Sequence, residues 1–323
     1  MFGYKGFNKG MTCRGFQYEV GQTYETKGKI ELCKSGFHFC PKMADVFDYY
    51  GSNDCRYAEV EALGQVIKGN DKCVTDRLRI VRELTKAEVF DAMYAQSGLE
   101  LKDLPFPALE LKDLPFSADE VIKTREDGTL DKLLPSGTEF PVRFSNGEWN
   151  VLVVARDKRY TYLVTKYIMA EPFAMNDERT NKGGWPASDM RKHVQEIYGM
   201  LPENFRKAVI PMHIRQLAHG TAVECDDPAF LLSAVNIFGE EAVFGEEEYS
   251  PEADCDDTQI DIFHYPTARI KGRPGASSAS WWWLRSANYY SNFYSVTTSG
   301  DWNYDTATSA SGVVVGFCIE SRA

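Results

Sequence analysis

The segment from Trp281 to Ile319 constrains the fold of this chain most, because two apolar blocks enclose a long polar stretch. The blocks are Trp281–Ser286 (WWWLRS) and Gly312–Ile319 (GVVVGFCI). Residues 288–308 between them contain four Tyr, three Asn, three Ser, four Thr, one Phe and one Trp, with one Val. A core needs more aliphatic side chains than this, and a disordered tail lacks aromatic ones. The pattern predicts an ordered surface with the composition of an antibody paratope.

We therefore expect the polar stretch to form a ligand-binding surface, with the two apolar blocks pairing as neighbouring central strands. In such a surface Tyr and Trp supply rigid contact area, while Asn, Ser and Asp supply adaptable hydrogen bonds. We expect its aromatic members to gather on one side of the domain. The predicted binding residues are Asn288, Tyr289, Tyr290, Ser291, Asn292, Phe293, Tyr294, Trp302, Asn303, Tyr304, Asp305 and Thr306.

The tryptophans divide between core and surface. Adjacent residues of a strand point to opposite faces, so the run of three cannot be exposed as a whole. We expect Trp282 and Trp283 in the core, and Arg285 as a buried arginine bound to a carboxylate or to carbonyls. Trp302 fits an exposed anchor and a core residue equally well.

Charge and composition exclude some partners. The net charge is −11, and no basic stripe is visible, which argues against a nucleic-acid partner. Acidic residues gather between 240 and 257, where a solvated loop is favoured over a calcium site because the spacing matches no EF-hand. We predict no cofactor and no metal ion.

We expect no targeting signal in this sequence. The start, MFGYKG, lacks the basic-then-apolar pattern of a signal peptide, and no segment reaches the length of a membrane span. We expect a protein that stays in the cytoplasm of the producing cell or becomes part of a virion, without membrane insertion.

Cysteine spacing favours free thiols. Five of the eight cysteines fall in the first 73 residues, and none forms a CxxC pair. A zinc site made from Cys13, Cys33, His38 and Cys40 is the alternative, but structural zinc sites usually show short paired spacings.

Three regions follow one another along the chain, and the fold class is α+β. Residues 1–97 read as a small α+β domain with strands at 17–20, 29–32, 57–63 and 78–81, a helix from Pro41 to Tyr50, and a helix capped by Thr85 and Glu88. Residues 98–120 contain the duplicated segment LELKDLPF, whose prolines forbid a continuous helix, and read as a linker.

Residues 121–323 read as a second α+β domain. Strands are expected at 140–144, 149–154 and 160–164, with a hairpin turn at Asn146-Gly147. Ser188 should cap a helix over 189–198. Residues 230–233 fit a helix or a buried strand on periodicity alone.

Several motifs of this second region occur in the order found in a known family. They are NKGGWPASDMR at 181–191, FLLS at 230–233, WWWLRS at 281–286 and GVVVGFCI at 312–319. Over roughly 125–323 the chain resembles a bacterial and phage domain family of unknown function with a C-type-lectin-like core, similar to formylglycine-generating enzymes. The resemblance implies a strand at 230–233.

The polar stretch also resembles the variable region of proteins diversified by retroelements. In that system mutation at template adenines converts Asn codons into codons for Asn, Ser, Tyr, Asp, Thr, Ala or Phe. Residues 288–294 and 303–306 all belong to that set. The resemblance implies a C-type-lectin scaffold that displays variable residues to a protein or glycan ligand.

The first region, through MTCRGFQYEVG at 11–21 and SGFHFC at 35–40, resembles an uncharacterised domain of phage and gut-bacterial proteins. This implies a phage or prophage setting without assigning an activity. An ADP-ribosyl-transfer-like site at His38 is a guess from general appearance.

Enzymatic patterns are weak. Formylglycine-generating enzymes use a close pair of cysteines, whereas Cys318 stands alone, and we interpret His193, His213, His219 and His264 as ordinary helix or loop residues. The leading hypothesis is a non-enzymatic ligand-binding protein with no catalytic residues. The alternatives are an enzyme with a catalytic N-terminal domain and a structural virion protein. The ligand's identity and the oligomeric state stay open.

Overall fold

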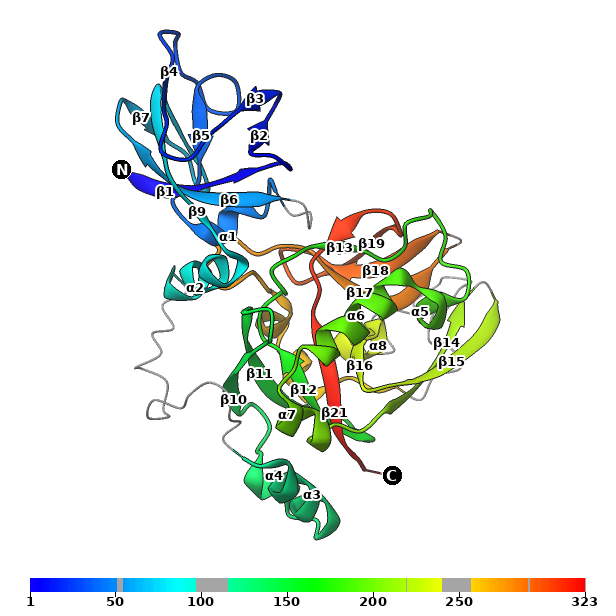
Figure 1. Ribbon diagram of the computed structural model, residues 1–323. Helices are drawn as coiled ribbons and strands as arrows, with labels where there is room; N and C mark the ends of the chain where they lie inside the picture. The colour runs from blue at the N-terminus through cyan, green and yellow to red at the C-terminus, as the bar shows by residue number, and fades with distance from the viewer. Residues whose placement is uncertain (51–54, 97–115, 219, 240–256, 290, 323) are drawn as a thin grey trace.

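The fold is α+β, as expected. The computed structural model describes residues 1–50, 55–96, 116–218, 220–239, 257–289 and 291–322. Figure 1 shows an N-terminal group of strands beside a larger C-terminal group of strands and helices. Within the described residues, no helix is both long enough and apolar enough to cross a membrane.

The N-terminal region, residues 1–96, is built from short antiparallel strands. A four-stranded sheet has the order β1-β6-β9-β4, and a three-stranded sheet has the order β5-β8-β7. The strands are β1 (Phe2–Phe7), β2 (Thr12–Cys13), β3 (Phe16–Gln17), β4 (Thr23–Glu25), β5 (Phe37–Phe39), β6 (Arg56–Ala62), β7 (Val66–Lys68), β8 (Cys73–Thr75) and β9 (Arg77–Leu84). The helices are α1 (Met43–Val46) and α2 (Lys86–Gln96).

Some N-terminal predictions are confirmed and others are wrong. The predicted strands near 57–63 and 78–81 are β6 and β9, and Thr85 and Glu88 cap α2 as a reciprocal pair. Residues 29–32 form no strand, since only one isolated bridge joins Glu31 to Ser35. The strand predicted at 17–20 ends at Gln17, and α1 covers only part of 41–50. Tight turns with left-handed residues such as Cys33 (φ 64°) replace the longer elements.

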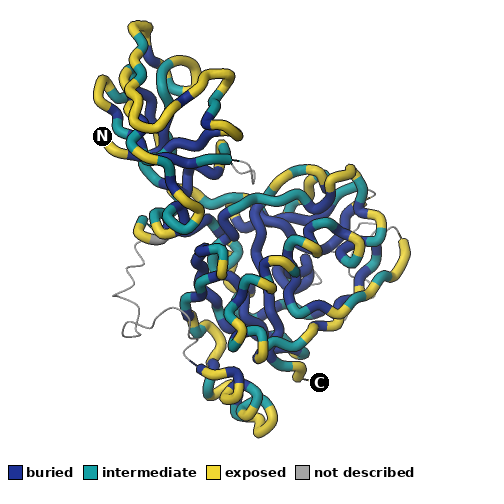
Figure 2. Tube along the Cα trace, in the orientation of Figure 1, coloured by how far each residue is buried: buried dark blue, intermediate teal, exposed yellow. Residues whose placement is uncertain are grey.

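The C-terminal region, residues 116–322, is organised around an antiparallel five-stranded sheet of order β10-β11-β12-β21-β16. Its strands are β10 (Glu139–Arg143), β11 (Trp149–Arg156), β12 (Tyr160–Thr165), β16 (Ala229–Leu231) and β21 (Val315–Ser321). Every residue of β12 is buried, in agreement with its uncharged sequence of Tyr, Thr, Leu and Val. Figure 2 shows the buried residues concentrated along these central strands.

Smaller sheets and short helices surround this core. The remaining strands are β13 (Phe173–Ala174), β14 (Met212–Ala218), β15 (Thr221–Asp227), β17 (Trp282–Asn288), β18 (Asn292–Val296), β19 (Trp302–Thr306) and β20 (Ala310–Ser311). The helices are α3 (Ala118–Glu126), α4 (Leu130–Leu133), α5 (Gly184–Ala187), α6 (Asp189–Gly199), α7 (Glu203–Ala208) and α8 (Ala234–Phe238), with 3₁₀ turns η1 (Asp261–His264) and η2 (Pro266–Arg269).

Local signals in this region are confirmed. Ser188 accepts the N–H of Arg191 and begins α6, which buries Met190, Val194 and Ile197 on one face. The Asn146-Gly147 turn joins β10 to β11, with Gly147 at φ 92°. Residues 229–231 form strand β16, as the family resemblance implied.

The predicted pairing of the two apolar blocks is wrong. β17 pairs with β18 in a three-stranded sheet of order β17-β18-β19, whereas β21 lies between β12 and β16. Their backbones pair at a single parallel bridge between Trp282 and Gly312, while their side chains share one core cluster. A short turn favours local hairpin pairing of β17 with β18, and β21 has an apolar neighbour on each side.

The predicted linker is only partly described, because 97–115 lie outside the described residues. Phe116, in the second copy of the duplicated segment, is buried, and its ring meets that of Phe140 at 5.3 Å between centroids. Ser117 then caps α3, so this helix begins within the range assigned to the linker.

Candidate functional site

The predicted binding residues lie on β17, β18, β19 and the turn that joins β17 to β18. Register places Asn292 opposite Thr306, Tyr294 opposite Tyr304, and Val296 opposite Trp302. Directly opposed residues point to the same face of a sheet. One face therefore carries Tyr294, Trp302 and Tyr304, and the other carries Phe293 with Asp305.

Three aromatic side chains on or beside this first face are exposed. Trp302 is 41% exposed, Tyr304 40% and Tyr289 45%. The rings of Tyr289 and Tyr304 meet edge to face at 5.7 Å between centroids, so the turn and β19 form one aromatic group. The alternative that places Trp302 in the core is thus excluded. Asp305 is exposed, and Ser291, Asn292, Asn303 and Thr306 are half-buried.

Other predicted binding residues are not at the surface. Phe293 and Tyr294 are buried, and so is Asn288. Phe293 belongs to the main core, and Tyr294 packs below Trp302 with ring centroids 6.0 Å apart. The composition suggested exposure throughout, but the middle strand of a three-stranded sheet is covered by its neighbours and by the core. Tyr290 lies outside the described residues.

The turn is fixed by a residue from a distant segment. Asn181 is fully buried, and its amide nitrogen donates to the carbonyl oxygens of Asn288 at 3.2 Å and Asn292 at 2.8 Å, and also to that of Tyr289. Tyr289 itself has a left-handed backbone with φ 45°. Sequence reasoning missed this role, although Asn181 opens the motif at 181–191.

The framework under the surface is as expected. Trp282 and Trp283 are buried, and their indole nitrogens donate to the carbonyls of Arg269 and Phe173 at 3.0 Å each. Arg285 is buried, forms an ion pair with Asp257, and donates to the carbonyl of Leu231 at 3.1 Å. Trp281, just before β17, is exposed instead.

His38, the guessed N-terminal site, lines a pocket of about 650 Å³. Its Nε2 accepts the backbone N–H of Cys33 at 2.9 Å. Burial, with help from Lys5, lowers the pKa of His38 and favours the neutral ring. The four residues of the alternative zinc site all line this pocket, yet the described residues contain no group of three His, Cys, Asp or Glu that could hold a metal ion.

Two family models match the chain, both of unknown function. The model described as Domain of unknown function (DUF6273) matches residues 160–321. The chain belongs to the DUF6273 family. The model described as Domain of unknown function (DUF7666) matches residues 1–92. No curated protein and no solved structure matches the chain.

Within the DUF6273 match, Cys318 and the histidines stand apart from one another. Burial raises the pKa of the Cys318 thiol to about 12, which leaves it protonated and unreactive at neutral pH. His193 stacks on Phe173 at 4.1 Å on helix α6, and His264 ends η1. His213 lies on strand β14 rather than in a helix or loop, exposed, with Asp226 at 2.9 Å. His219 is outside the described residues.

Proposed function

We propose that this chain is a non-enzymatic ligand-recognition protein whose DUF6273 region is a C-type-lectin-like display domain. The observation that carries the proposal is the exposed aromatic group of Tyr289, Trp302 and Tyr304. It stands on a sheet whose other face carries the buried side chains of Trp283 and Phe293. Exposed aromatic residues on a rigid support are typical of recognition surfaces.

The chemistry around this group suits a protein or glycan ligand. The flat faces of Tyr and Trp can pack against apolar side chains or sugar rings. The half-buried Asn292 and Thr306 lie on the same face of the sheet as Trp302 and Tyr304 and supply hydrogen-bonding groups of short length. Such a mixture binds with little loss of side-chain entropy.

We further propose that this segment is diversified by a retroelement, and that the exposed positions are the ones that vary usefully. Changes at Tyr289, Tyr304 and Asp305 would alter the surface without disturbing the core. Changes at Phe293 or Tyr294 would remove buried side chains and cost stability. The positions that can vary without loss of stability are therefore fewer than the residues of the polar stretch.

The remaining regions have supporting roles in the proposal. A separate N-terminal domain, matched by the DUF7666 model, would connect through the duplicated segment to the display domain. This arrangement fits a phage or prophage protein that presents its C-terminal surface to a receptor.

Sequencing the gene and its neighbourhood tests the diversification. We expect a reverse transcriptase gene and a template repeat that aligns with codons 288–306. Differences between the repeat and the gene should fall at template adenines. A neighbourhood without such a repeat would contradict diversification.

Binding is tested by screening the purified chain against arrays of defined glycans and of bacterial surface proteins. The triple variant Tyr289→Ser, Trp302→Ala, Tyr304→Ser should lose at least tenfold in affinity for any ligand found. Phe2→Ser is the matched control, since it removes a more exposed ring from β1. Equal affinity of the triple variant and the parent protein would overturn the proposed surface.

A further inference from the structure

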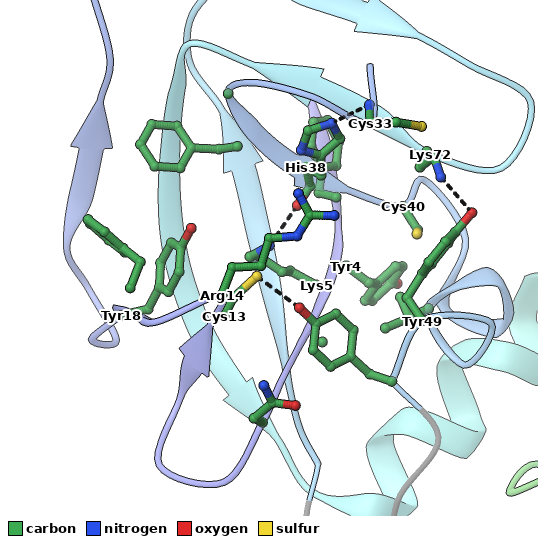
Figure 3. A pocket seen from close by; sticks show the side chains of 18 of the residues that line it. Tyr4, Lys5, Cys13, Arg14, Tyr18, Cys33, His38, Cys40, Tyr49 and Lys72 are labelled. Atoms are coloured by element: carbon green, nitrogen blue, oxygen red, sulfur yellow. Dashed lines mark hydrogen bonds between the residues drawn. The ribbon is translucent and has the colours of Figure 1, made fainter. Parts of the chain in front are cut away.

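The N-terminal region contains a pocket that the proposed display function does not use. It measures about 650 Å³, within the range of small-molecule sites. Residues from β1, β5, the β2–β3 hairpin and the turn after α1 contribute to its wall. Figure 3 shows Lys5, Cys13, Arg14 and His38 in this wall.

The charged side chains of this wall are all basic. Lys5, Arg14, Lys34 and Lys72 line the pocket together with His38, and the described lining includes no Asp or Glu. This composition contrasts with the net charge of −11 of the chain. A concave surface of one charge sign attracts ligands of the opposite sign.

Lys5 is the most unusual of these groups, because it is buried and has no acidic partner among the residues that the structure describes. Its ammonium nitrogen donates to the carbonyl of His38 at 2.9 Å and lies 3.8 Å from the sulfur of Cys13. It also lies 5.4 Å from the ring centre of Tyr18. Carbonyl and ring contacts stabilise a cation, but they leave its charge uncompensated.

The surroundings of Lys5 and His38 disfavour their charged forms. Burial and the nearby Arg14 lower the pKa of Lys5. Burial, Lys5, Arg14 and Lys72 lower the pKa of His38. Each of these groups would hold its proton more tightly if an anion entered the pocket.

The carboxylates nearest the pocket already have partners. Asp71 accepts a hydrogen bond from the hydroxyl of Tyr49. Asp45 accepts hydrogen bonds from Ser277, and Asp48 pairs with Arg273 at 2.7 Å. These contacts direct Asp45 and Asp48 toward the C-terminal region. Lys34 pairs with Glu31 at 2.6 Å and Lys72 donates to the hydroxyl of Tyr49 at 3.0 Å, whereas no ion pair to Lys5 or Arg14 is seen among the described residues.

Aromatic rings line the same pocket. Phe16, Tyr18 and Phe37 form a group with centroid distances of 4.8 Å for Phe16–Tyr18 and 6.3 Å for Phe16–Phe37. Phe16 is exposed despite its size. An exposed ring in a pocket wall is a stacking surface for a planar ligand.

We propose that this pocket binds a nucleotide, with its phosphates beside Lys5, Arg14 and Lys72 and its base against the ring of Phe16. Cations alone would favour any small anion, and rings alone would favour any planar molecule. Only a ligand with both an anionic group and a planar ring contacts the cations and the aromatic rings of the pocket together.

The test measures binding of three probes to the full chain by titration calorimetry. ADP carries both phosphates and a base, inorganic phosphate carries only the charge, and adenosine carries only the base. ADP should bind at least tenfold more tightly than either of the others. ADP binding no tighter than inorganic phosphate, or no ADP binding at all, would overturn the proposal.

Variants locate the ADP site. Arg14→Gln and Lys72→Gln should each weaken ADP binding by about tenfold, the usual effect of losing one contact to a charged group. Lys27→Gln is the control, since it removes one positive charge from an exposed position outside the pocket. Similar losses in all three variants would show a nonspecific charge effect and overturn the site.

Cys13 gives an independent readout. Its sulfur accepts a hydrogen bond from the hydroxyl of Tyr50 at 2.8 Å within the pocket. Bound ADP should slow the alkylation of Cys13 by iodoacetamide, followed by mass spectrometry of the peptide that carries it. Cys55, which is half-buried and outside the pocket lining, should be alkylated at the same rate with and without ADP. Equal rates at Cys13 with saturating ADP would contradict binding in this pocket.

Discussion

At the residue scale, single buried polar side chains organise the surface and the junction of this protein. Asn181 is the clearest case, because one amide group holds three backbone carbonyls of the β17–β18 turn. Backbone carbonyls at a tight turn lack partners from a neighbouring strand, so a side-chain donor supplies their hydrogen bonds. The turn that presents Tyr289 therefore depends on a residue more than one hundred positions earlier in the chain.

Glu148 makes stability depend on pH. It is buried after the β10–β11 turn, where it accepts the N–H of Ala170, and burial raises its pKa to about 7. In the unfolded chain a glutamate has a pKa of about 4.3. Between these values the folded state binds more protons than the unfolded state, so stability falls as the pH rises from about 4 to about 7.

We predict that Glu148→Gln removes this loss. The variant should gain about 2 to 3 kcal/mol relative to the parent protein on going from pH 5 to pH 8. Urea unfolding followed by tryptophan fluorescence at the two pH values measures it. Glu178→Gln, on an exposed segment, is the control. The same pH profile in the parent protein and Glu148→Gln would contradict the predicted ionisation.

At the element scale, β18 and β19 differ although both are rich in Tyr and Asn. β18 is the middle strand of its sheet and is buried from Phe293 to Val296. β19 is an edge strand and exposes Trp302, Tyr304 and Asp305. Position in the sheet, rather than composition, decides which of these residues are exposed.

Two tyrosines that face each other across these strands test this difference. Tyr304→Ser should change the free energy of unfolding by no more than about 0.5 kcal/mol, as surface substitutions usually do. Tyr294→Ser should cost about 3 kcal/mol or more, because it empties a buried site. Urea unfolding of the two variants gives both numbers. Equal losses would show that β19 is part of the core.

The sequence predicted individual strands, helix caps and turns better than it predicted which strands pair with one another. The strands at 149–154 and 160–164, the cap at Ser188 and the turn at Asn146-Gly147 follow from patterns within a few residues. Whether β17 lies beside β18 or β21 depends on contacts between distant segments, and no local pattern contains that information. The burial of Tyr294 was missed for the same reason.

At the scale of the whole molecule, the N-terminal and C-terminal regions share a buried contact. Phe90 and Met93 of α2 pack with Trp149 and Ala170 in one apolar cluster. Beside it, Asp45 accepts hydrogen bonds from the backbone N–H of Ser277 at 2.8 Å and from its hydroxyl at 2.9 Å. The two regions therefore stabilise each other.

A double-mutant cycle at this junction should show coupling. Asp45→Ala and Ser277→Ala should each destabilise the protein, and the double variant should lose less than the sum by about 1 kcal/mol. The amide of Ser277 should also exchange its hydrogen faster in Asp45→Ala. Strictly additive losses with unchanged exchange would mean that the contact contributes nothing in solution.

The pocket of the N-terminal region could not be predicted from sequence. Lys5 and His38 are far apart in the chain, and nothing in the sequence shows that Lys5 is buried. Cys13, Cys33, His38 and Cys40, the residues of the alternative zinc site, all line this pocket. Metal sites and ligand pockets both contain groups of Cys and His side chains, so the sequence pattern alone does not distinguish them. The positions of Lys5, Arg14 and Lys72 around these residues indicate an anion-binding pocket rather than a metal site.

Strand β21 follows residues 288–306 in the sequence but lies inside the five-stranded sheet, between β12 and β16. During synthesis, the sheet stays incomplete until residues 315–321 have left the ribosome, so this region can fold only after residues 288–306 have been translated. An insertion or deletion that shifts the reading frame within codons 288–306 would replace β21 with unrelated residues. Such chains would fail to fold and be degraded, whereas substitutions at exposed positions would pass. The order of the strands thus removes frameshifted products and keeps chains that carry only substitutions within residues 288–306.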